Sequence, residues 1–83
     1  MKITIIGGGN LGTLMGAMFA AKGHEITIHT SKPDKFSKEL EVYSEKEELL
    51  YKGIIARVTN NWKESIENAE LIWVVVFLHF FFI

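Results

Sequence analysis

Three glycines near the amino terminus have the spacing G-x-G-x-x-G, within the segment Gly7, Gly8, Gly9, Asn10, Leu11 and Gly12. Such a turn holds phosphates when it directly follows a strand and opens a helix. Gly7 would then permit a tight turn out of the strand, Gly9 would let the backbone approach a diphosphate, and Gly12 would let the helix pack closely on the strand. Free N–H groups and the helix dipole favour the negative phosphates at that point.

The number of glycines is itself informative. Each glycine in an ordered segment costs about 0.5–1 kcal/mol relative to alanine. The four glycines of this turn therefore cost about 2–4 kcal/mol, against a domain stability of about 5–15 kcal/mol. A connection that binds nothing could avoid most of that cost, so we interpret the turn as a nucleotide site.

The segments around the glycines have the character that this interpretation requires. Lys2–Ile6 is a short, β-branched strand candidate, and Asn10–Lys22 carries apolar residues at helical spacing. Gly23 is typical of a helix C-terminus, and His24–Thr30 alternates as a second strand would. The sequence therefore predicts a βαβ unit, which almost always has a right-handed crossover.

The segment after the second strand admits two interpretations. Ser31 is predicted to cap a short helix, with Asp34 three residues later. We then expect a hairpin formed by Glu39–Tyr43 and Leu49–Lys52. The alternative is one helix that continues to about residue 52, because apolar residues also recur there at helical spacing.

Two further strands are predicted in the rest of the chain. Ile54–Thr59 is a third strand candidate, and Asn61–Glu64 has the form of a capping box that opens a helix to about Asn68. Leu71–Val76 is apolar at every position, which predicts a strand covered on both faces. Together these elements predict an α/β chain with a partial Rossmann fold and a parallel sheet in the order 3-2-1-4.

In this fold a dinucleotide lies across the carboxyl ends of the first and fourth strands, where we expect Val75 and Val76 to contact it. An acidic residue at the end of the second strand usually binds the adenosine ribose. That position falls at Thr30, followed by Ser31 and Lys32. Two hydroxyls and an ammonium group could donate hydrogen bonds to a 2′-phosphate. The sequence therefore favours NADP over NAD, and NAD remains the alternative.

These motifs resemble the N-terminal domain of the octopine/nopaline (opine) dehydrogenase family. The resemblance lies in the glycine turn and in Gly23–Thr27, Val58–Asn61 and Trp62–Ile72, and it extends to about residue 76. Ketopantoate reductases and NAD-dependent glycerol-3-phosphate dehydrogenases are neighbouring families that share these motifs.

The resemblance implies an oxidoreductase that joins an amino acid to a 2-keto acid, with hydride from NAD(P)H. In that family the substrate-binding residues lie in a later helical domain, so only the cofactor positions are carried over. We expect this chain to lack the implied catalytic domain and to be inactive on its own. A non-catalytic NAD(P)-sensing module is the alternative from another functional class.

Composition excludes several classes of function. The chain has no cysteine, which excludes disulfides and thiolate chemistry, and its net charge of −1 gives no reason to expect a nucleic-acid partner. The three histidines lack metal-ligand spacing. The uncharged run from Ile3 to Ala21 suggests a signal peptide as a rival, but its glycines interrupt the apolar core early. We expect a cytoplasmic protein with no membrane segment.

The resemblance ends after Val76. Residues 77–83 form an apolar, phenylalanine-rich tail where the family usually has a proline or small residue and a loop. We therefore divide the chain into an incomplete dinucleotide-binding domain at 1–76 and an aberrant tail at 77–83, as a truncated or frameshifted gene would give. An exposed tail of this kind would favour self-association.

Overall fold

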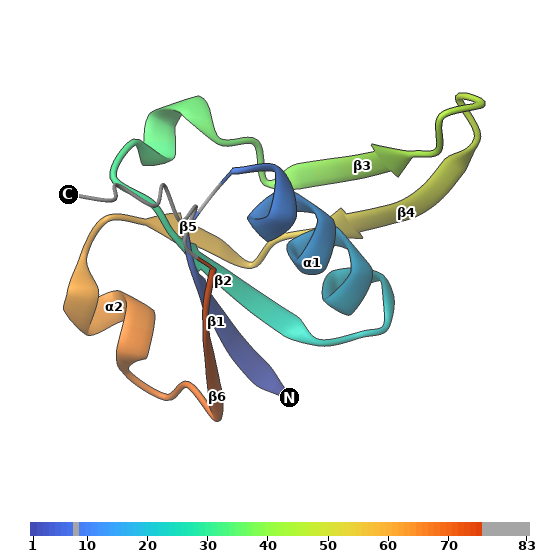
Figure 1. The fold of residues 1–83 in the computed structure, drawn as a ribbon. Coiled ribbons are helices and arrows are strands. Elements are labelled where there is room, and N and C mark those ends of the chain that lie inside the picture. The colour runs from blue at the N-terminus through green and yellow to red at the C-terminus, as the bar shows by residue number, and fades with distance from the viewer. Residues whose placement is uncertain (8, 76–83) are drawn as a thin grey trace, which may run out of the picture.

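The computed structural model describes residues 1–7 and 9–75, which form an α/β fold built on a parallel sheet of four strands (Figure 1). Val76 and the tail at 77–83 lie outside the described residues, as does Gly8. The elements in chain order are β1 (Lys2–Ile6), α1 (Asn10–Ala21), β2 (Glu25–His29), the 3-10 helix η1 (Pro33–Lys35), β3 (Glu39–Tyr43), β4 (Leu49–Ile54), β5 (Arg57–Thr59), α2 (Trp62–Ile66) and β6 (Leu71–Val74).

The four-stranded sheet has the order β5-β2-β1-β6, and all three pairings are parallel. This order confirms the predicted arrangement 3-2-1-4, with β5 as the third strand and β6 as the fourth. At the centre of the sheet Ile5 of β1 pairs with Ile28 on one side and Trp73 on the other. The strand order therefore reverses beside β1, which in this fold creates a crevice at the carboxyl ends of β1 and β6.

One face of the sheet packs against α1 and forms the core of the molecule. β1 and β2 supply fully buried isoleucines to this face because alternate residues of a strand point the same way. Burying one such side chain stabilises the fold by about 1.5–3 kcal/mol. The buried core consists of Ile3, Ile5, Met15, Ala17, Ile26, Ile28, Leu40 and Ile55.

The second, two-stranded sheet is the predicted hairpin, with β3 antiparallel to β4. It lies against α1 (Figure 1), and the alternative of one helix to about residue 52 is wrong. Gly53 makes the close approach possible. A Cβ added there would lie 2.7 Å from the Cβ of Ala20 and 2.8 Å from the carbonyl oxygen of Ala17.

The third strand of the main sheet begins later than predicted. Ile54 belongs to β4, whereas β5 starts only at Arg57. Between them Ile55 turns into the core and is 1% exposed, while its N–H donates to the carbonyl of Lys38 at 2.7 Å. The apolar run at 54–55 thus joins two sheets, which the sequence pattern alone does not reveal.

The opposite face of the main sheet carries α2 (Figure 1). Half of the predicted capping box is present, because the side-chain oxygen of Asn61 accepts from the N–H of Glu64 at 3.1 Å. The reciprocal half is replaced, since the N–H of Asn61 donates to the hydroxyl of Thr59 at 3.0 Å. The helix ends at Ile66 and does not reach Asn68, whose positive φ of 68° is incompatible with it.

β6 differs from the prediction of a strand covered on both faces. Its four side chains are 39–57% exposed, although Trp73 contacts the ring of Phe19 with 5.8 Å between centroids. The reason is that β6 is an edge strand, which pairs with β1 alone among the described residues. The apolar side chains of β6 are therefore not buried by the described residues.

Candidate dinucleotide-binding site

The turn between β1 and α1 brings the backbone of Gly7 against the end of β6. Gly7 has a φ of 110°, a conformation that residues with a Cβ rarely adopt. A Cβ added to it would overlap the carbonyl oxygen of Val75, and its N–H donates to the carbonyl of His29 at 2.9 Å. Only glycine fits this position, as expected for a tight turn out of the first strand.

Gly12 lets α1 pack against the turn that precedes it. The residue is buried, and a Cβ added there would overlap the carbonyl oxygen of Gly7 and lie 3.9 Å from the Cγ2 atom of Ile5. The helix therefore approaches the strand as closely as the spacing of the motif predicts.

Gly9 differs from the other two glycines because nothing surrounds the place of its missing side chain. No heavy atom lies within 4 Å of a Cβ built on it. Gly9 is the N-cap of α1, it makes no side-chain cap, and the first turn holds no acidic residue. Helices leave their first N–H groups without a partner in the helix. The open space above Gly9 is therefore bordered by donors and suits an anion.

The hydroxyl of Thr13 already has a hydrogen-bond partner within this turn. It donates to the carbonyl of Gly9 at 2.8 Å, and the N–H of Thr13 donates to the same oxygen at 3.0 Å. Leu11, also in the first turn of α1, is 54% exposed. The turn thus offers backbone donors and an exposed apolar side chain to the sheet edge.

The end of β2 brings Thr30 to the same edge of the sheet, since β1 and β2 are parallel. The N–H of Thr30 donates to the carbonyl of Thr59 at 3.0 Å, and Ser31 and Lys32 are exposed. The prediction that Ser31 caps a helix is wrong. Lys32 holds the N-cap position of η1 without a side-chain cap, because the ring of Pro33 fixes the first residue of this short turn.

Val75 lies at the crevice next to the glycine turn. It is half-buried, and its N–H donates to the carbonyl of Ile6 at 2.8 Å, which extends the β1–β6 pairing beyond β6. The structure thus brings Gly7, Gly9, Leu11, Gly12 and Val75 together and adds Thr30, Ser31 and Lys32 along the same edge. Gly8 and Val76 are outside the described residues, and the side chain of Asn10 is not described.

A carboxylate at this edge escaped the sequence interpretation. Glu64 of α2 accepts a hydrogen bond from the hydroxyl of Thr59 at 2.8 Å, and Thr59 is in turn bonded to Thr30. The acidic residue of this fold is expected at the end of the second strand, and Glu64 lies far from that strand in the sequence. Because Glu64 belongs to the capping motif, its type and position already had a structural explanation.

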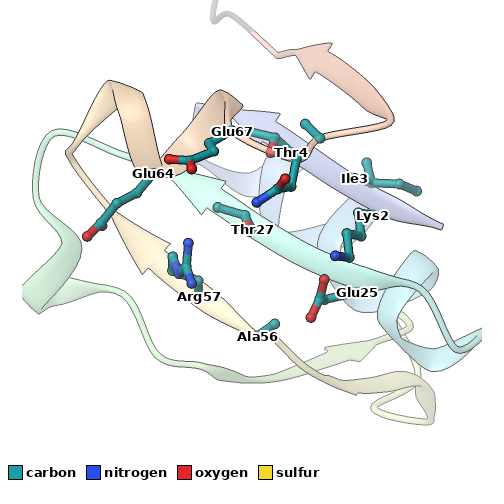
Figure 2. A pocket seen from close by; sticks show the side chains of 11 residues that line it. Lys2, Ile3, Thr4, Glu25, Thr27, Ala56, Arg57, Glu64 and Glu67 are labelled. Atoms are coloured by element: carbon teal, nitrogen blue, oxygen red, sulfur yellow. The ribbon is translucent and has the colours of Figure 1, made fainter.

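A separate pocket of about 200 Å³ lies on the face that carries α2 (Figure 2). Its lining includes the first residues of three strands, Lys2, Glu25 and Arg57, and it reaches Glu64 and Glu67 of the α2 segment. The pocket therefore opens toward the amino ends of the strands. No glycine of the turn lines it, so it is distinct from the crevice at the carboxyl ends.

The comparison with known families agrees with this geometry. The family described as "NAD-dependent glycerol-3-phosphate dehydrogenase N-terminus" matches residues 2–82. The chain belongs to this family. No curated protein and no solved structure matches the chain.

As a member of this family, the chain is an N-terminal NAD-binding domain of the glycerol-3-phosphate dehydrogenase type, and its cofactor is a nicotinamide dinucleotide. The match confirms the predicted dehydrogenase-type dinucleotide-binding domain, whereas membership of the opine dehydrogenases stays a prediction. No helix of the described residues combines the length and the apolar character that crossing a membrane requires.

Proposed function

We propose that the chain binds NADP(H), with the diphosphate on the glycine turn and the adenosine ribose at the end of β2. The observation that carries this proposal is the open space beside Gly9, at the start of α1. At the other two glycines of the motif, Gly7 and Gly12, backbone atoms already occupy the place of a side chain. At Gly9 no neighbouring atom fills the place of a side chain, so the space is available to a ligand.

The preference for NADP(H) is supported by the groups that follow β2. Thr30 and Ser31 contribute hydroxyls, and Lys32 is exposed and forms no ion pair with any described residue. Its ammonium group would attract a 2′-phosphate. Glu64 acts in the opposite sense, although its carboxylate already accepts a hydrogen bond from Thr59.

For the parent enzyme we propose the opine dehydrogenase reaction, in which NAD(P)H reduces the imine of an amino acid and a 2-keto acid. The bound cofactor supplies the hydride, and this chain contributes its position and its electrostatic environment. Substrate-binding and proton-transfer residues would come from a further domain, so the chain alone would show no turnover. The second candidate is a glycerol-3-phosphate dehydrogenase-like parent, which the family match favours.

Calorimetric titration of the purified chain with NADPH and NADH tests the cofactor proposal. We expect saturable binding of both, with NADPH tighter, and no oxidation of NADPH when pyruvate and an amino acid are added. Equal or tighter binding of NADH would overturn the preference for NADP. Absence of binding to either cofactor would overturn the proposed function.

A further inference from the structure

An exposed tryptophan lies on a buried histidine at the carboxyl edge of the sheet. Trp62, the first residue of α2, is 56% exposed. Its ring stacks on His29 with 3.7 Å between centroids and 23° between planes, whereas His29 is only 8% exposed. One side of the indole is therefore supported by the protein, while much of the ring remains open.

The histidine below the indole is held in place by α2. Its Nδ1 atom lies 2.6 Å from the hydroxyl of Ser65, which is 1% exposed. The same hydroxyl also lies 3.0 Å from the carbonyl oxygen of Asn61, which ties it to the start of α2. The imidazole is thus fixed in orientation, and it gives Trp62 a rigid base.

The position of this aromatic pair relates it to the cofactor. His29 is the last residue of β2 and directly precedes Thr30, where the adenosine ribose would lie. Thr30 is bonded to Thr59, and Trp62 follows three residues after Thr59. The indole therefore lies near the carboxyl ends of β2 and β5, on the adenosine side of the glycine turn.

We propose that Trp62 is the stacking platform for the adenine ring of the dinucleotide. This inference rests on the proposed function and assigns a residue to the adenine end of the cofactor. A planar base suits an indole that is flat, exposed and rigidly supported, since stacking needs a π-face without demanding particular hydrogen bonds. Removing the indole should weaken binding by about 5- to 150-fold, the range observed for base–aromatic stacking.

The test compares Trp62→Ala, Trp62→Phe and Trp73→Phe in calorimetric titrations with NADPH and with 2′,5′-ADP, which lacks the nicotinamide. Circular dichroism checks that each variant is folded. Trp62→Ala should lower the affinity for both ligands by the same factor, and Trp62→Phe should lower it less. Trp73→Phe should bind both ligands as tightly as the unsubstituted chain does. Trp73 lies on β6 and is the matched control.

A fluorescence titration keeps the proposal testable if Trp62→Ala fails to fold. In Trp73→Phe the only tryptophan is Trp62, and 2′,5′-ADP should quench its emission with the dissociation constant found by calorimetry. Unchanged emission on saturation, or unchanged affinity in a folded Trp62→Ala variant, would refute the platform while leaving the proposed function intact. If the unsubstituted chain binds neither ligand, both proposals fall.

Discussion

Alanine substitutions at Gly9 and Gly12 separate binding from folding within the same turn. The two residues belong to one motif, but the added methyl group meets different surroundings. At Gly9 it would enter open space, whereas at Gly12 it would overlap the carbonyl oxygen of Gly7. We therefore expect Gly9→Ala to affect the ligand and Gly12→Ala to affect the fold.

The magnitudes follow from these surroundings. For Gly9→Ala, the added methyl group meets no atom, and the loss of a favourable N-cap residue costs about 1 kcal/mol. Its melting temperature should fall by no more than about 8 °C. Overpacking at Gly12 costs about 1–3 kcal/mol, which lowers the melting temperature by about 4–24 °C in a domain of this size.

Binding should respond in the opposite way. A hydrogen bond to a charged group contributes about 1.5–3 kcal/mol, so a methyl group that holds the diphosphate away from one N–H should weaken NADPH by about 10- to 150-fold. Thermal unfolding followed by circular dichroism and titration of NADPH measure the two effects. A folded Gly9→Ala variant that binds NADPH as tightly as the unsubstituted chain would refute this interpretation of the turn.

Three further predictions concern the adenosine side and the hairpin. Glu64→Gln keeps an acceptor for Thr59 but removes the charge, so the affinity for NADPH relative to NADH should rise by about two- to tenfold; an unchanged ratio would place Glu64 outside the site. Lys32→Gln should lower the affinity for NADPH by about two- to fivefold in low salt and leave the affinity for NADH unchanged. Equal losses of affinity for both cofactors would contradict a 2′-phosphate contact. Gly53→Ala should lower the melting temperature by about 4–24 °C, because the new Cβ meets Ala20 and Ala17; a stable variant would show that the hairpin does not need this close approach.

Patterns carried by neighbouring residues were sufficient to predict the sheet and the glycine turn. The alternation in β1 and β2 and the G-x-G-x-x-G spacing are local signals, and the strand order follows from right-handed crossovers. The hairpin was predicted as one of two alternatives. Its decisive feature is the contact between Gly53 and α1, which joins residues more than thirty positions apart and leaves no periodic signal.

The features that the sequence did not predict depend on the tertiary environment. Hydrophobicity cannot distinguish a central strand from an edge strand, so β6 was expected to be covered although Val74 is 57% exposed. Ile55 lies in the connection between β4 and β5, yet its side chain is buried in the core. Residues 54–59 therefore have the sequence pattern of one continuous strand. Glu64 reaches the carboxyl edge only because α2 folds back beside Thr59.

Backbone amide chemical shifts during titration with NADPH test the central claim most directly. The largest changes should fall on the N–H groups of Gly7, Gly9 and Gly12 and on the first turn of α1, with smaller changes at Thr30. If the changes instead cluster around the pocket at Lys2 and Arg57, or if none occur at saturating cofactor, then the glycine turn is not the place where the diphosphate binds.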